Sequence, residues 1–247
     1  MPLNAAIQQK IETLKSKRQP VLLPSNDLES KLWHFRETDV LAALNEEERH
    51  WLATSTSMVT CERGRVFYSP LERSEVVFIL KKGRVNLYRL TEDGRKLVIA
   101  SLDAHTIFGE MNLIGQGMYG CFAEAAEDCV ICVLSRSDMQ TLIRKNPEVG
   151  LRLLAEMGKR LQEREHALES LAFRSVAARL ARLLLSEMDA SGLVSGFTHQ
   201  ELAERLGTYR ETVSQSLGKF KGEGLIAIEP KVIRVIDKKK LGEYASE

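Results

Sequence analysis

The sequence predicts an α+β fold, in which a β-roll is followed by a long helix and then by a C-terminal domain of helices and a β-hairpin. Between residues 57 and 134, short apolar runs alternate with turn residues, which is typical of a small antiparallel barrel or roll. From Pro147 to about residue 172, apolar residues recur at helical spacing. Two short amphipathic segments then flank Gly207, and a hairpin pattern follows between residues 226 and 236.

The length and composition place the chain among ordinary globular proteins. A chain of 247 residues is long enough for two modest domains or one large one, and its 44% apolar and 28% charged residues are usual values. No apolar run approaches about 18 residues, and the N-terminus lacks a signal-peptide pattern, so we expect a cytoplasmic protein without a membrane partner. The net charge of +1 neither favours nor opposes nucleic-acid binding, which needs local positive charge.

Helical patterns precede the predicted roll. Residues 1–27 are expected to form an extension, because Ile7, Ile11 and Leu14 have the spacing of a short amphipathic helix that packs on a neighbour or a partner subunit. Asn45 stands before three glutamates and is expected to cap a helix with an acidic first turn.

The roll domain is expected to span residues 28–145. Residues 76–80 and 84–90 form strands on either side of a turn at Gly83, and Asp93-Gly94 is a hairpin turn before the next strand. Ser137 is expected to cap a short helix that ends the domain at Lys145.

The four cysteines are expected to be structural. Cys129 and Cys132 have the C-x-x-C spacing of metal and redox sites, but they lie in an apolar run that predicts a buried strand. Residues three apart on a strand point to opposite faces, so the two thiols diverge. No second C-x-x-C is present to complete a ligand set, and we expect neither a metal nor an iron–sulfur cluster.

Residues 146–173 are expected to form one long helix with a hinge at its end. Asn146 is expected to cap it, with Pro147 as the first helical residue. A leucine stripe of this length usually pairs with its own copy in a coiled-coil dimer, and the alternative is burial against the roll alone. The expected dimer contacts are Leu154, Met157, Leu161 and Leu168.

Residues 174–247 carry the pattern of a winged helix-turn-helix, and Ser175 is expected to cap its first helix, over residues 176–188. Thr198 and Glu201 have capping-box spacing at the start of one helix, and Gly207 is expected to end it with positive φ. The second helix directs Val213 and Leu217 inward and a polar face outward, as in a helix that enters the major groove. A two-strand hairpin after it forms the wing. Two amphipathic helices of any α domain are the alternative interpretation.

This order of elements resembles the cyclic-AMP receptor protein superfamily of transcription factors, which includes the fumarate–nitrate reduction regulators, over roughly residues 28–240. Residues 108–113 are similar to the start of that family's phosphate-binding cassette. Residues 161–173 are similar to its dimer helix and hinge, and residues 207–213 to the start of its recognition helix. The resemblance implies a cyclic-nucleotide-binding-like roll, a homodimer, a twofold-symmetric operator and RNA polymerase as a partner.

By the same resemblance, Arg210 and Glu211 are the main base contacts. Arg can pair bidentately with guanine O6 and N7, and Glu can accept from cytosine N4. Gln215 stands where cyclic-AMP-binding members usually have a further Arg, so the operator is expected to share only part of the family half-site. The other expected DNA contacts are Thr198, Gln200, Thr208, Tyr209, Thr212, Ser214 and Lys219.

The resemblance also implies an effector pocket in the roll. Its expected residues are Phe108, Gly109, Glu110, Met111, Leu113, Tyr119, Gly120, Cys121 and Arg164. Tyr119 and Gly120 stand about where cyclic-nucleotide-binding members hold the phosphate with an Arg-Ser or Arg-Thr pair, and Arg164 and Glu165 replace a Thr-Ser pair of the dimer helix. A phosphate without its cation loses a bond worth ~1.5–3 kcal/mol, so we expect an effector other than cyclic AMP, or constitutive activity.

Other functions remain open as alternatives. A member of the family can respond to a cyclic nucleotide or sense a gas through heme, for which His34, His50, His105, His166 and an N-terminal Pro2 are possible ligands. An iron–sulfur member carries an N-terminal cysteine cluster, whereas the first 60 residues here contain no Cys. Catalytic patterns such as H-E-x-x-H or a P-loop are absent from the sequence, so we expect no enzyme. A regulatory module of a kinase or channel would lack the winged helix.

Overall fold

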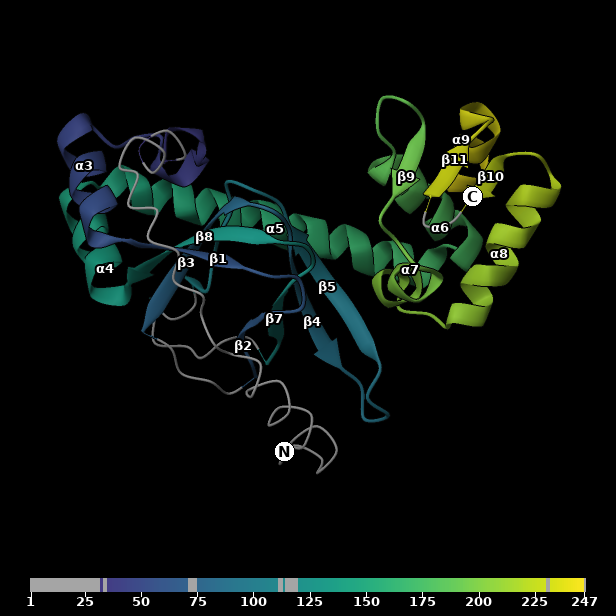
Figure 1. Ribbon diagram of the computed structural model, residues 1–247, viewed down its shortest axis with the longest axis horizontal. Coiled ribbons are helices and arrows are strands. Elements are labelled where there is room, and N and C mark those ends of the chain that lie inside the picture. The colour runs from purple at the N-terminus through teal and green to yellow at the C-terminus, as the bar shows by residue number, and fades with distance from the viewer. Residues whose placement is uncertain are drawn as a thin grey trace. The chain divides into compact units, whose positions relative to one another are not determined.

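The structure is a computed structural model, which describes residues 32, 35–70, 75–110, 113, 120–229 and 232–246. The chain divides into two compact units, one of residues 1–94 and 99–161 and the other of residues 95–98 and 162–247. The mixture of a β-rich first unit, a long helix and a helical second unit with a small sheet is the α+β class that the sequence predicts (Figure 1). The proposed helix of the N-terminal extension lies outside the described residues.

Two four-stranded sheets form the roll of the first unit, with strand orders β1-β8-β3-β6 and β2-β7-β4-β5. Gly83 lies between β3 and β4, which belong to different sheets. Its φ is 93°, and a Cβ at this position would lie only 2.5 Å from the Asp128 carbonyl oxygen, so a side chain has no room. Gly94 ends the tight turn between β4 and β5, as expected. The strands are β1 Ser57–Cys61, β2 Val66–Tyr68, β3 Val76–Lys82, β4 Val85–Leu90, β5 Lys96–Leu102, β6 Ile107–Phe108, β7 Phe122–Ala125 and β8 Cys129–Ser135.

Strand β8 lies between two apolar cores, and its two cysteines pack in different ones. Cys129 packs in a core with residues of both sheets, whereas Cys132 packs in a second core with residues of the flanking helices. The two thiols therefore lie on opposite faces of the strand, as the sequence predicts. All four cysteines are free and buried. Among the described residues, no group of three or more His, Cys, Asp and Glu side chains is placed to hold a metal ion.

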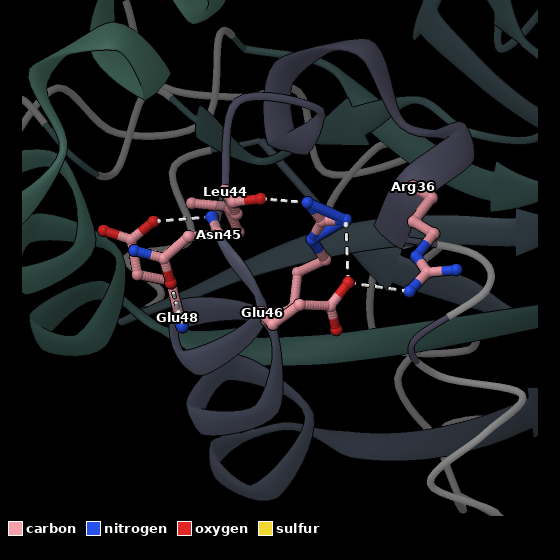
Figure 2. A network of polar contacts seen from close by, with 6 residues as sticks. Arg36, Leu44, Asn45, Glu46 and Glu48 are labelled. Atoms are coloured by element: carbon pink, nitrogen blue, oxygen red, sulfur yellow. Dashed lines mark hydrogen bonds and ion pairs between the residues drawn. The ribbon is translucent and has the colours of Figure 1, made fainter.

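Helices pack against the roll through the second apolar core: the 3-10 turn η1 (Asp39–Leu41), α3 (Glu46–Ser55) and α4 (Arg136–Lys145). Figure 2 shows the reciprocal capping box of Asn45 and Glu48 at the start of α3, and the ion pair of Arg36 with Glu46 at 2.8 Å. The sequence placed the cap of α4 wrongly at Ser137. The cap is Ser135, because β8 runs directly into the helix and the Ser135 hydroxyl accepts from the Asp138 amide.

Helix α5 (Pro147–Phe173) is 27 residues long and begins at the expected proline. The side chain of Asn146 donates to the Ala43 carbonyl (3.3 Å) and to Glu48 Oε2 (3.1 Å), so it joins the start of α5 to the cap of α3. Val149 is the buried residue of α5. None of the helices in the described part of the chain has the length and apolar character needed to cross a membrane.

The second unit contains α6 (Val176–Glu187), α7 (His199–Leu206), α8 (Arg210–Gly222) and α9 (Lys238–Ser246) around one apolar core. Ser175 caps α6 as expected, through the Ala178 amide. The hairpin of β10 (Ile226–Glu229) and β11 (Val232–Val235) is the predicted wing. The structure adds two elements that the sequence reasoning missed, namely α9 and the third strand β9 (Leu193–Ser195), which pairs with β11.

Candidate nucleic-acid interface

The helix pair α7–α8 is built as its sequence predicts. The Thr198 hydroxyl accepts from the Glu201 amide while the Glu201 carboxylate accepts from the Thr198 amide at 2.8 Å, which satisfies two orphan donors of the helix start. Gly207 ends α7 with φ 61°, a left-handed conformation that a side chain disfavours. Tyr209 is the N-cap of α8, so the second helix begins within residues 207–213, the segment that resembles the start of the family's recognition helix.

Helix α8 has a buried side and a polar side. Val213, Leu217 and Phe220 are fully buried in the core of the unit. The opposite side presents the exposed side chains of Arg210, Glu211 and Gln215, with the half-buried Thr212 and Ser214 beside them. A helix anchored by one face can therefore offer donors, acceptors and a cation to the edges of bases in a major groove.

The other expected DNA contacts lie in two places. Thr198 and Gln200 are exposed at the start of α7, and Thr208 and Tyr209 form the turn before α8, with 58% of Tyr209 exposed. The Gln200 amide donates to Glu204 Oε1 at 3.1 Å. Lys219 is further along α8, and its Nζ lies 4.7 Å from the ring centroid of Tyr244 in α9.

Two arginines hold the helix pair in place, and the sequence reasoning missed both. Arg179 of α6 donates from Nη1 to the Leu206 carbonyl at the end of α7 (2.5 Å), and burial lowers the pKa of its guanidinium. Arg205 of α7 pairs with Glu187 of α6 at 2.6 Å, with both side chains less than a fifth exposed. A cation at the C-terminus of α7 satisfies its last carbonyls and interacts favourably with the helix dipole.

His199 also has a partner that was not anticipated from the sequence. Its Nδ1 lies 2.8 Å from the Ser214 hydroxyl oxygen, so the first residue of α7 is hydrogen-bonded to the polar side of α8. Both side chains are half-buried. A separation of 15 residues gives no local sequence signal for this contact.

The expected effector residues fall partly inside the core of the roll. Phe108 is completely buried, and its ring centroid lies 4.9 Å from that of Phe78 and 5.4 Å from that of Phe67. Cys121 is buried in the same core, and the Leu113 carbonyl accepts from Gln140 Nε2. Gly109 and Gly120 have positive φ, at 80° and 53°. Met111 and Tyr119 lie outside the described residues, and Arg164 is half-buried on α5.

Glu110 has a cationic partner within the first unit. Arg160 of α5 pairs with Glu110 Oε1 at 3.2 Å, and both side chains are only 11% exposed. The same guanidinium donates to the Ile107 carbonyl (2.6 Å) and pairs with Glu156 (3.0 Å). The start of the expected effector segment is therefore joined to the long helix by a buried ion pair.

A hollow of about 290 Å³ opens near these residues in the roll. Phe67 and Phe78 form part of its wall, and both rings also contact Phe108. Cys61 and Arg65 line it as well, and burial raises the pKa of the Cys61 thiol although the Arg65 cation opposes that shift. Most of the described residues that line the hollow are apolar, and Arg65 places a cation on its wall.

The expected dimer contacts form an exposed apolar stripe on α5. Leu154, Leu161 and Leu168 are 68%, 60% and 66% exposed, and Met157 is half-buried. These four residues recur at the a and d spacing of a heptad.

The histidines considered as heme ligands are dispersed in the described residues. His50 lies on α3, His105 in a turn with φ 69°, and His166 on α5 beside Glu169 at 3.7 Å. His34 and Pro2 lie outside the part of the chain that the structure describes.

The sequence matches two family models. A cyclic nucleotide-binding domain matches residues 58–146, and a Crp-like helix-turn-helix domain matches residues 178–244. The chain is 32% identical over 184 residues to the cyclic AMP receptor protein of Thermus thermophilus, covering 74% of this chain and 85% of that protein. It is 30% identical to the global nitrogen regulator of a Nostoc species, covering 71% of this chain and 83% of the regulator.

Solved structures agree with the sequence comparisons. A transcriptional regulator of the CRP/FNR family from Thermus thermophilus superimposes with a TM-score of 0.67 at 28% identity, covering 77% of this chain and 99% of the other. FixK2 of Bradyrhizobium japonicum has the same fold, with a TM-score of 0.67 at 21% identity. This chain therefore belongs to the CRP/FNR family of transcriptional regulators, whose helix-turn-helix binds DNA.

Proposed function

We propose that this protein is a homodimeric regulator that recognises a twofold-symmetric operator, with Arg210 and Glu211 as its main base contacts. The observation that carries the proposal is the polar face of α8, on which Arg210, Glu211 and Gln215 are exposed while the opposite face is fully buried. Arg favours guanine and Glu favours cytosine, whereas Gln215 favours adenine. Thr198, Gln200, Thr208, Tyr209, Thr212 and Lys219 are proposed to contact the backbone, which positions the protein without selecting a sequence.

The dimer is proposed to form along α5. Three leucines seven residues apart, each at least 60% exposed, leave an apolar surface that an identical helix can cover. A dimer then sets two copies of α8 against two half-sites, as the family's twofold operators require. RNA polymerase is the proposed protein partner, by family analogy alone.

The effector site is proposed to lie in the roll, and cyclic AMP is not the proposed ligand. Glu110 already pairs with Arg160, and a glycine, Gly120, follows Tyr119 where a phosphate-binding pair is expected. Of the two relatives, the cyclic AMP receptor protein of Thermus thermophilus is named for cyclic AMP, whereas the global nitrogen regulator is not. Constitutive activity is the alternative, and a cyclic-nucleotide response or heme-based sensing are further ones.

Selection from a random duplex library with the full chain tests the DNA-binding proposal. We expect an inverted repeat with identical half-sites about one helical turn apart. Recovery of unrelated sequences contradicts sequence-specific recognition. Calorimetry with cyclic AMP and a visible absorption spectrum test the effector alternatives: heat of binding would favour cyclic AMP, and a Soret band would favour heme.

The variant Leu161→Asp tests the dimer. Each copy loses a buried leucine, worth ~2–5 kcal/mol in a packed seam, and places a carboxylate there, so sedimentation should show monomers at concentrations where the wild type is dimeric. Gln162→Asp is the matched control, because it adds the same charge to the neighbouring exposed position off the stripe. If Leu161→Asp dimerises at the same concentrations as Gln162→Asp, the dimer does not form along the leucine stripe of α5.

A further inference from the structure

His199 joins the two helices of the helix-turn-helix at the side that carries the proposed base contacts. Its Nδ1 lies 2.8 Å from the Ser214 Oγ. Ser214 stands four residues after Arg210, so it shares that residue's face of α8. His199 is the first residue of α7, between the exposed Thr198 and Gln200 that are proposed to lie at the DNA backbone.

The chemistry of this hydrogen bond decides what Ser214 can offer to a base. A serine hydroxyl has one proton and two lone pairs, and a free hydroxyl rotates to donate or to accept. In a neutral imidazole one ring nitrogen carries the proton and the other accepts, and the bond made by one nitrogen fixes the role of the other. A partner at Nε2 therefore determines the direction of the bond between Nδ1 and Ser214.

We infer that His199 is a positioning residue that couples a phosphate contact to base recognition by Ser214. The inference rests on the proposed function, since it needs α8 in a major groove. The Nε2–H group of His199 donates to a phosphate of the bound duplex, because the first helix of this motif crosses the backbone. Nδ1 then accepts a hydrogen bond from the Ser214 hydroxyl. The Ser214 oxygen is left as an acceptor only, so it favours the amino group of adenine or cytosine over the O4 of thymine or the O6 of guanine.

Two substitutions separate the two halves of this arrangement. In His199→Asn the side-chain oxygen takes the place of Nδ1, so it can accept from Ser214 but cannot reach the phosphate. In His199→Gln the terminal amide takes the place of Nε2, so it can reach the phosphate but leaves Ser214 free to rotate. The two variants have the same functional group and differ only in where it lies.

The experiment uses the full chain and a duplex selected by the wild type from a random library, with each base pair then replaced in turn. The base pair whose preference falls in Ser214→Ala marks the Ser214 contact. There we expect the wild type and His199→Asn to favour an amino-bearing base about fivefold, the size of one hydrogen bond, and His199→Gln to lose that preference. Overall affinity should fall in His199→Asn and stay near wild type in His199→Gln.

A purely structural hydrogen bond between the helices predicts a different result. Both variants would then lose the same affinity for every duplex in the series, and the melting temperature of the protein would fall equally in both. That result overturns the inference, and so does an unchanged preference in both variants. A library that yields no preferred duplex overturns the proposed function and the inference together. If a variant does not fold, ¹⁵N NMR of His199 in the wild-type complex decides, since a proton on Nδ1 rather than Nε2 excludes the arrangement.

Discussion

The helix-turn-helix and the roll hold their candidate residues in place by different means. In the helix-turn-helix, the capping box of Thr198 and Glu201 spans three residues and Gly207 ends the same helix. In the roll, Glu110 is held by Arg160, 50 residues further along the chain, and Phe108 is held by Phe67 and Phe78. The first site is fixed mainly by neighbours in the sequence, and the second by contacts between distant segments.

This difference follows from what each site must do. A base-recognising surface needs one straight helix with its side chains outward, which caps and an apolar stripe can specify locally. A pocket must be enclosed by several segments, so each wall depends on packing against others. A change in one wall can alter what the pocket binds while the DNA-binding surface keeps its geometry.

Arg160→Met should remove the ion pair with Glu110 and cause the largest loss of stability among the variants considered. It leaves the Glu110 carboxylate buried without its cation, and loss of one partner of a buried pair typically costs ~3–5 kcal/mol. Trp51 lies on α3 of the first unit, and residues 95–98 and 162–247 contain no tryptophan, so tryptophan fluorescence in urea does not report unfolding of the second unit.

The double variant Arg160→Met, Glu110→Gln is the control for Arg160→Met. It removes the unpaired charge as well as the cation and should recover much of the lost stability. If the double variant is no more stable than the single one, the ion pair is not the reason for the loss.

Local signals explain which features could be predicted from the sequence. The caps at Asn45, Ser175 and Thr198 were predicted because a cap and its helix are adjacent. The cap of α4 was misplaced because two serines, Ser135 and Ser137, stand two residues apart where the helix begins, and only the end of β8 at Ser135 decides between them. The contacts of Arg160, Arg179 and His199 join separate elements, and a single sequence contains no signal for them.

Arg179→Ala should lower the stability of the helix-turn-helix. The contact of Arg179 with α7 comes from a separate helix, whereas the other features that hold this site are mainly local in sequence. The variant removes a charged hydrogen bond to the Leu206 carbonyl, and we expect the second unit to lose ~1.5–3 kcal/mol of stability. Hydrogen exchange of α7 and α8, followed by mass spectrometry, measures this loss. Arg182→Ala, on the exposed face of α6, is the control. Equal protection in the two variants would mean that the hydrogen bond from Arg179 to the Leu206 carbonyl does not stabilise α7.

Arg210→Ala should leave the fold intact and weaken DNA binding. A lost bidentate base contact costs ~1–3 kcal/mol, and only the base pair that Arg210 contacts should lose its preference. Titration of the selected duplex and of one changed at that base pair measures both effects. Lys219→Ala is the control, because loss of a proposed backbone contact should weaken both duplexes alike and reduce the dependence on salt. An unchanged affinity of Arg210→Ala would place the recognition helix in another register.

The smallest expected effect is a pH dependence confined to the roll, since all four cysteines lie between residues 61 and 132. Burial raises the pKa of the Cys129 thiol to about 11, and Cys129 is only 2% exposed. In the unfolded chain the thiol ionises at its ordinary pKa of about 8.5. Between these values the unfolded chain releases a proton that the folded roll retains, so the stabilisation is complete at pH 8 and is lost as the pH approaches 11.

Urea unfolding of the wild type and of Cys129→Ala, followed by tryptophan fluorescence at pH 8 and pH 10.5, measures the pH dependence. Other groups titrate in this range in both proteins, so the prediction concerns the difference between them. The wild type should lose more stability than Cys129→Ala as the pH rises. Equal losses would show that the thiol ionises equally easily in the folded roll and in the unfolded chain, and the enclosed environment inferred for this face of β8 would then be wrong.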